Sequence, residues 1–140
     1  MSRAGGPPFA QSMPVRPAGI DAVAAVLVFG GLFGLSQLAI GDFAITGSLP
    51  SKGPIVGVAV ILYAASAALG ILVRTGRGWL GALNLAAVFA LIYFAAFGHA
   101  VPTVLGALHA GATLTLWRFR SWFRATDAWR AAQGSASTSR

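Results

Sequence analysis

The sequence contains no cysteine and no glutamate, and it has few charges of either sign. The absence of cysteine excludes disulfides, thiolate metal sites and a cysteine nucleophile, but it leaves the compartment open. The three acidic residues, Asp21, Asp42 and Asp127, are too far apart in the chain to form a pair of carboxylates for general acid and base catalysis. Charged residues make up 9% of the chain and hydrophobic residues 56%, whereas soluble domains are roughly a quarter charged. Bulk water is therefore not the main solvent of this protein.

The net charge of +7 raises the question of a nucleic-acid partner, because basic patches release counterions from phosphate. The basic residues, however, flank apolar runs or lie in the tails, and they form no dense cluster that could follow a phosphate backbone. Anionic lipid headgroups attract basic segments beside a membrane by about 1 kcal/mol per residue. The sequence thus predicts a bilayer with anionic headgroups as the partner, and no nucleic acid.

Four apolar stretches are long enough to be transmembrane helices, since about 30 Å of hydrocarbon takes roughly 20 residues. They cover about residues 20–40, 55–73, 79–97 and 101–117. Only the first contains a full charge, Asp21 at its start. A cleavable signal peptide is the alternative for this first stretch, but the run is too long for one, and Asp42 and Phe43 follow it instead of small residues.

The distribution of basic residues predicts the orientation of these spans, because retained positive charge marks the cytoplasmic side. Only Lys52 falls on one side. The other side holds both tails and the turn at residues 74–78, with Arg3, Arg16, Arg74, Arg77, Arg118, Arg120, Arg124, Arg130 and Arg140. We therefore expect a multi-pass protein of the plasma membrane with both termini in the cytoplasm.

The two ends of the chain differ in composition from the spans and from each other. Residues 1–15 and 132–140 are predicted to be disordered tails around a transmembrane domain of residues 16–117. Between Phe119 and Trp129, aromatic residues recur at helical spacing, which predicts a juxtamembrane amphipathic helix over residues 118–131 that lies in the membrane interface. The alternative is that it extends the fourth span into solvent. The expected interface anchors are Trp79, Trp117, Trp122, Trp129, Arg118, Arg120 and Arg124.

The fold class that follows is an all-α membrane protein, an antiparallel bundle of four transmembrane helices with a C-terminal amphipathic interfacial helix. Close approach of such helices depends on small residues, because lipid provides no hydrophobic drive between them. Small residues recur four positions apart at Gly30 and Gly34, Ser66 and Gly70, and Gly106 and Ala110. We expect these faces to pack within the bundle rather than against a second copy.

Polar residues at membrane depth are the candidates for function, because they are costly there and usually face the interior. Gln37, Asn84 and Thr113 are candidates for a polar path, and none of the polar residues in the spans is a full charge, which argues against a proton pump or an ion-coupled carrier. His109 could bind the metal of a haem or chlorophyll, or relay a proton. The alternative for His109 is a hydrogen-bonded packing residue, and for this reason no cofactor is expected.

The first span begins with an acidic residue that has several basic neighbours. Asp21 is close in sequence to Arg16 and could approach Arg74 or Arg77 in space. The simplest interpretation is a structural ion pair that also stabilises the helix N-terminus. An acidic ligand site at the interface is the alternative.

Three short motifs resemble those of small bacterial four-span membrane proteins of unknown function. The motifs are Arg16-Pro17-Ala18-Gly19-Ile20 at the start of the first span, the run from Gly70 through the basic turn to Trp79, and Arg118-Phe119-Arg120-Ser121-Trp122-Phe123. The resemblance covers about residues 16–123. It implies the same four-span topology, and no activity, substrate or catalytic residue.

The functional expectation is correspondingly broad. We expect a non-enzymatic structural or accessory subunit of a larger membrane complex. The alternatives are a small channel or transporter built from copies of the chain, and a haem- or pigment-binding subunit that uses His109.

Overall fold

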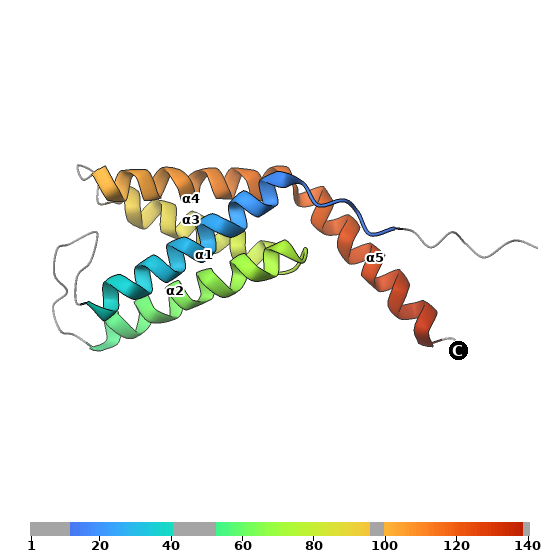
Figure 1. The fold of residues 1–140 in the computed structure, drawn as a ribbon, viewed down its shortest axis with the longest axis horizontal. Helices are drawn as coiled ribbons and strands as arrows, with labels where there is room; N and C mark the ends of the chain where they lie inside the picture. Colours follow the sequence, from blue (N-terminus) through green and yellow to red (C-terminus); the bar gives the residue numbers. More distant parts are fainter. Residues whose placement is uncertain (1–11, 41–52, 96–99, 139–140) are drawn as a thin grey trace, which may run out of the picture.

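The computed structural model describes residues 12–40, 53–95 and 100–138 (Figure 1). These residues form five α-helices and no strand, so the prediction of an all-α protein is confirmed for this part of the chain. The helices are α1 (Ala18–Ala39), α2 (Gly53–Arg74), α3 (Trp79–Ala95), α4 (Ala100–Arg118) and α5 (Arg120–Thr138). Lys52, the basic residue expected on the outer side, lies outside the described residues.

Three of the helices are long and apolar enough to cross a membrane, namely α1, α2 from Val56, and α4. Their bounds agree with the predicted spans to within two residues. The third predicted span, residues 79–97, corresponds to α3, an apolar helix of 17 residues. The expectation of a membrane protein is thus supported by three candidate membrane spans.

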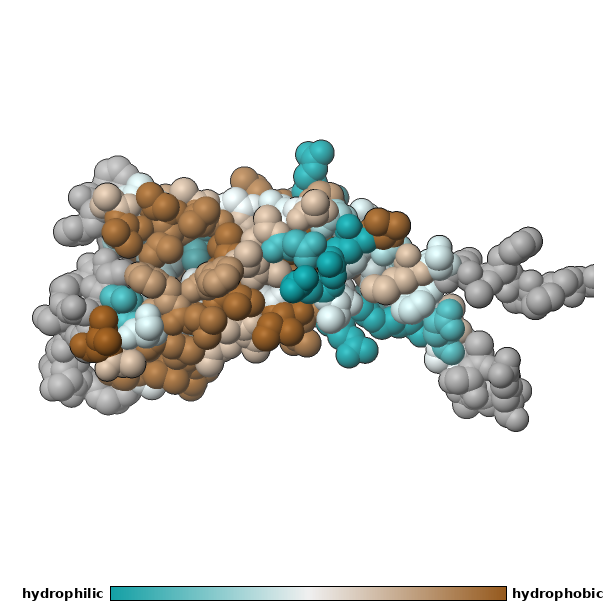
Figure 2. Space-filling view, viewed as in Figure 1, coloured by the Kyte–Doolittle hydropathy of each residue, from teal (hydrophilic) through white to brown (hydrophobic). Residues whose placement is uncertain are grey.

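The helices α1 to α4 lie side by side in two closely packed pairs (Figure 1). One pair is α1 with α2, the other is α3 with α4, and the pairs meet where α1 contacts α4 and α2 contacts α3. Ile20, Leu27, Val73, Ala86 and Leu116, from all four helices, are fully buried in a shared core. Large apolar side chains also cover much of the outer surface, which appears as a brown belt in Figure 2.

The turn between α2 and α3 depends on two glycines. Gly76 and Gly78 have φ angles of 74° and 66°, in the left-handed region where a side chain is unfavourable. The amide of Gly76 donates to the carbonyl of Val73 at 2.9 Å, and that of Arg77 to the carbonyl of Leu72 at 3.1 Å. These bonds satisfy carbonyls at the end of α2 and allow the chain to reverse within a few residues.

Small residues lie at the contact between α1 and α2. Ser66 donates a hydrogen bond of 2.9 Å to the carbonyl of Leu27. A methyl group at Gly70 would come within 2.7 Å of Val28 Cγ2, and one at Gly34 would meet the ring of Tyr63. At Gly31 it would lie 2.5 Å from the carbonyl oxygen of Tyr63. Glycine at these positions lets the backbones of α1 and α2 approach closely.

The other predicted small residues face different neighbours. Gly30 lies against His109 of α4, and Gly106 lies against the ring of Phe94 of α3. Ala110 is half-buried on α4. Gly30 and Gly34 therefore face different helices, although they are four residues apart.

Helix α5 follows a break at Phe119 and extends obliquely beyond the end of the other four helices (Figure 1). It continues to Thr138, past the predicted end at residue 131, and it includes most of the segment predicted as a disordered tail. Ala131 and Ala132, at the predicted end of the helix, have high helix propensity. Phe123 and Thr126 are fully buried and Trp122 nearly so. The first half of the apolar face of α5 is thus covered by the protein's own residues.

Candidate functional site

His109 lies at the centre of a cluster of rings in the interior. It is 1% exposed, nine residues after Ala100 and nine before Arg118, so it sits midway along α4. Its ring centroid is 5.3 Å from that of Phe89 and 5.4 Å from that of Tyr93. Phe89 also stacks on Tyr63 at 5.2 Å. Two rings of α3 therefore hold the imidazole in place, and Tyr63 of α2 supports one of them.

The two ring nitrogens of His109 have different surroundings. Nδ1 is 2.8 Å from the carbonyl of Leu105, one turn earlier in α4. Since a carbonyl can only accept, Nδ1 carries the proton in the neutral ring, and Nε2 is left as an acceptor. Nε2 faces Gly30, where a methyl group would lie 3.3 Å from it.

An open groove between α1 and α4 reaches this histidine. It has a volume of about 330 Å³, and His109 is the only polar residue that lines it. Gly30 of α1 also lines the groove, and so do Phe29 and Phe33. The imidazole is therefore the floor of an apolar groove on the outer surface.

Metal ligation by His109 would depend on the ring nitrogen that faces Gly30. Coordination would have to use Nε2, since Nδ1 is bonded to Leu105, and a ligating nitrogen lies about 2 Å from its metal. In the described part of the chain, no three side chains of His, Cys, Asp or Glu come together as a metal site.

The three residues predicted to form a polar path are not brought together. Thr113 donates its hydroxyl to the carbonyl of His109, a bond of 2.9 Å within α4. Gln37 is half-buried near the end of α1, and Asn84 is exposed on α3. Between them the interior is filled by Tyr63, Phe89, Tyr93 and other apolar side chains. A path along these residues would have to run between copies of the chain.

The predicted ion pair at the start of α1 is present in the structure. The carboxylate of Asp21 lies 3.2 Å from Nε of Arg16 and 3.1 Å from Nε of Arg74. Arg16 also donates to the carbonyl of Arg74 at 3.2 Å. No ion pair of Arg77 is found within the described residues. The carboxylate therefore joins the segment before α1 to the end of α2.

A second set of polar contacts holds α5 against the turn between α2 and α3. Arg130 donates to the carbonyls of Thr75 and Gly76 and pairs with Asp127 at 2.8 Å. A methyl group at Gly76 would lie 2.8 Å from Cγ2 of Thr126, so this glycine also makes room for α5. The guanidinium of Arg130 satisfies carbonyls that the turn leaves open.

The aromatic anchors divide between buried and exposed positions. Phe123 stacks on Trp79 at 5.9 Å, and Trp122 donates its indole N–H to the carbonyl of Pro14 at 3.4 Å. Trp129 is half-buried. Trp117 is exposed, with the guanidinium of Arg120 4.7 Å from the centre of its ring. Arg118 and Arg124 are exposed as well.

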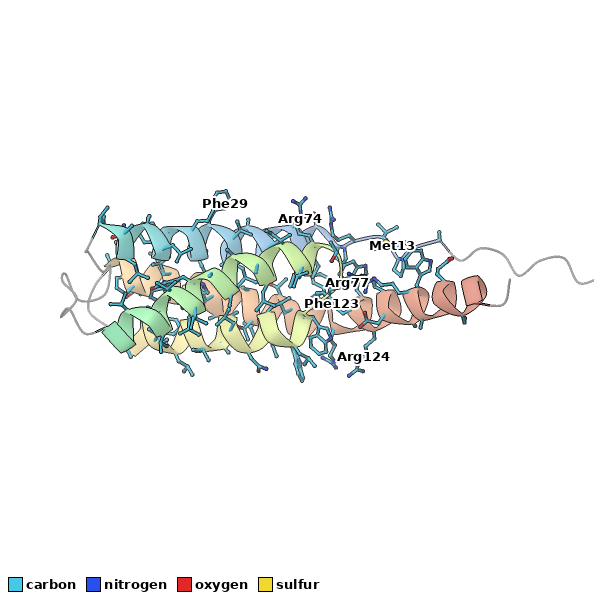
Figure 3. The ribbon with its side chains drawn as sticks, turned by 90° about the horizontal axis from the view of Figure 1, so that it is seen from below. Met13, Phe29, Arg74, Arg77, Phe123 and Arg124 are labelled. Atoms are coloured by element: carbon cyan, nitrogen blue, oxygen red, sulfur yellow. The ribbon has the colours of Figure 1, made fainter. Side chains whose placement is uncertain are left out.

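All charged residues of the described chain lie at one end of the molecule. They are Arg16, Asp21, Arg74, Arg77, Arg118, Arg120, Arg124, Asp127 and Arg130, from the ends of α1, α2 and α4 and from α5. Figure 2 shows them as a teal region next to the apolar belt, and Figure 3 labels Arg74, Arg77 and Arg124 in it. We call this region the arginine end.

The sequence pattern predicts no role for Phe89 or Gly31, no contact of Gly76 with α5, and no contact of Arg130 with the turn after α2. Phe89 precedes Tyr93 by four residues, so a ring pair on one helix face could have been inferred. Gly31 lies beside the Gly30 and Gly34 pair in sequence. Its importance follows only from the position of α2, whose backbone it contacts. Gly76 and Arg130 are each about 50 residues away in sequence from the residues that they contact, and no local pattern indicates these contacts.

Comparison with known proteins adds no relative. No protein-family model matches the chain, and no curated protein and no solved structure matches it either. The functional interpretation therefore rests on the residues and their geometry.

Proposed function

We propose that the chain is a four-span membrane protein with both termini in the cytoplasm, and that it acts without catalysis as an accessory subunit of a membrane complex. The observation that supports this most is the position of the charges. Every charged side chain of the described residues belongs to the arginine end, and the belt beside it carries none. Such a division suits one layer of hydrocarbon beside one layer of anionic headgroups.

The direction of the helices supports α3 as the fourth span. Helix α2 ends at the arginine end with Arg74, and α4 starts at the opposite end and returns to Arg118. The chain must cross between them, and α3 is the helix that does so. Its 17 residues extend about 26 Å at helical rise, close to the thickness of the hydrocarbon.

A non-catalytic role is supported by the use of the polar groups. In the part of the chain that the structure describes, no buried side-chain nitrogen or oxygen lacks a hydrogen-bond partner, and most such bonds go to backbone carbonyls. These groups hold the helices together. The exposed charged groups lie at the arginine end, where Arg77, Arg118 and Arg124 are accessible to lipid or to another subunit.

The topology can be tested by cysteine labelling, because the chain has no cysteine of its own. We would label Thr75→Cys and Ala100→Cys variants in intact cells with a membrane-impermeant maleimide. The expected result is reaction at position 100 in intact cells, and at position 75 only after permeabilisation. Labelling of both positions from the same side would show that α3 does not cross the membrane.

The accessory role needs a separate measurement. A photo-crosslinking residue in place of Arg124 is expected to capture one defined membrane protein in native membranes, while the same residue in place of Leu91 captures mainly lipid. Leu91 is an exposed apolar residue of α3 and so provides a matched control. Recovery of the free chain alone from both variants would contradict the accessory role.

The exposed position of Asn84 supports a second candidate function, a channel or transporter formed by several copies of the chain. Its amide is exposed on α3, an apolar helix, and a polar group that faces lipid gains from a hydrogen bond to another helix. Ion flux in liposomes is the test, with Asn84→Leu as the comparison. Flux equal to that of empty vesicles would exclude this candidate.

A further inference from the structure

The groove between α1 and α4 has the properties of a binding site for a small amphiphile. Pockets for small ligands are mostly apolar, have a few fixed polar groups and begin at roughly 300 Å³. This groove has about 330 Å³, apolar walls and one imidazole at its floor. Phe29, labelled in Figure 3, projects outward from α1 at its rim and is 71% exposed.

The imidazole presents a hydrogen-bond acceptor to this groove. Nδ1 is occupied by the carbonyl of Leu105, and no described residue donates to Nε2. His109 and Gly30 both line the groove, and Nε2 is the ring nitrogen that faces Gly30. An acceptor at the middle of a membrane helix, away from bulk water, requires a donor.

Gly30 is the reason that Nε2 is accessible. A methyl group at this position would lie 3.3 Å from Nε2 and 3.2 Å from Cε1. Glycine therefore leaves space beside the ring that any other residue would fill. The phenyl rings of Phe29 and Phe33 stand on the same wall of the groove and can pack against a flat aromatic ligand.

From these features we propose that the groove binds a lipid-soluble hydroquinone, whose phenolic O–H donates to Nε2 of His109 and whose ring lies against Phe29 and Phe33. The hydrocarbon tail continues between α1 and α4 into the surrounding lipid. The oxidised quinone is a poor ligand here, because its carbonyl groups accept hydrogen bonds and so does Nε2. The inference goes beyond the accessory role and rests only on the membrane location.

The test is binding of 2-decylhydroquinone to the full chain in lipid nanodiscs, with its dimethyl ether as the control ligand. The ether has the same ring and tail but no O–H, and we expect it to bind about tenfold more weakly, the factor of one net hydrogen bond. The 15N resonance of His109 Nε2 should shift on addition of the hydroquinone and stay unchanged with the ether. Equal affinities, or no shift with either ligand, would overturn the proposal.

Two variants locate the site. Gly30→Ala is expected to reduce hydroquinone binding at least to the level of the ether, because its methyl group covers Nε2, while alanine suits the helix better than glycine. Gly111→Ala on α4 is the matched control, since a methyl group there meets nothing within 4 Å, and it should bind as the original chain does. Unchanged binding by Gly30→Ala would also overturn the proposal.

His109→Phe keeps an aromatic ring and removes the acceptor. It should bind the hydroquinone and the ether equally, and retained preference for the hydroquinone would contradict the role of Nε2. The cysteine labelling at positions 75 and 100, on either side of α3, tests the topology without any ligand. A failure of hydroquinone binding with correct labelling would therefore leave the membrane topology intact.

Discussion

The interior of α1 to α4 and the arginine end are held together by different physics. In the interior, glycines let backbones touch, rings stack around His109, and no charge is present. At the arginine end, guanidinium groups bind backbone carbonyls and carboxylates, and two glycines allow a sharp turn. The stability of the interior therefore depends on close packing of side chains. The stability of the arginine end depends on hydrogen bonds and ion pairs, which water can partly replace and salt can screen. Substitutions should cost more in the first region than in the second.

The largest effect is expected for Gly31→Ala at the contact between α1 and α2. The added methyl group would lie 2.5 Å from the carbonyl oxygen of Tyr63 and 2.8 Å from the amide of Ala67, and backbone atoms cannot give way as a flexible side chain can. We expect a loss of about 3 kcal/mol of stability, measured as the shift of the unfolding curve in mixed micelles. Gly111→Ala should leave the curve unchanged, and equal curves for both variants would remove the distinction between the two regions.

Gly76→Ala tests whether the arginine end also contains a sterically determined position. A left-handed φ costs an alanine about 1–2 kcal/mol, and its methyl group would press on Thr126. Hydrogen exchange measured by mass spectrometry should become faster in α5 and remain slow in α1 and α4. Gly134→Ala on α5 is the control, because its added methyl group would meet nothing within 4 Å. Unchanged exchange in α5 would mean that it is held by other contacts.

Ser66→Ala removes one hydrogen bond from the interior without a change in packing. The bond to the carbonyl of Leu27 joins two helices, and such bonds contribute about 0.6 kcal/mol in membrane proteins. The same unfolding measurement should detect this loss. Ser36→Ala removes a bond of 2.7 Å to Phe33 within α1 and should have no measurable effect. A larger loss at Ser36 would contradict the importance of contacts between helices.

Asp21→Asn should have the smallest effect, although it removes two ion pairs. Both partners are partly exposed, and pairs of this kind contribute less than about 1 kcal/mol in total. The loss should be measurable in 0.05 M salt and vanish in 1 M salt, because salt screens exposed charges. A loss that is independent of salt would indicate that Asp21 acts through packing instead.

The helices were predictable because each depends on local information. The lengths of the apolar runs were enough to predict α3 and α4 to within two residues of their observed ends. The neighbours of each helix face were not predictable in the same way. Gly30 and Gly34 were expected to share one face, but α1 lies between two helices, so Gly30 meets α4 and Gly34 meets α2.

The candidate sites were predictable to a smaller extent. Polarity alone singled out His109 and Asp21, and the ion pair of Asp21 with Arg16 and Arg74 followed from their positions at helix ends. The groove beside His109 arises from the packing of α1 on α4, which no pattern in the sequence records. The amphipathic pattern of α5 likewise suits a lipid surface or a protein surface, and only the fold shows that Trp79 covers Phe123.

The positions of the tryptophans make one end of the molecule visible to spectroscopy. The chain has four of them, Trp79 at the start of α3, Trp117 at the end of α4, and Trp122 and Trp129 on α5. Tryptophan emission, excited at a wavelength that tyrosine does not absorb, therefore reports on the arginine end, whereas Tyr63 and Tyr93 lie in the ring cluster at His109. Emission from the unlabelled, ligand-free protein can follow the release of α5 in real time.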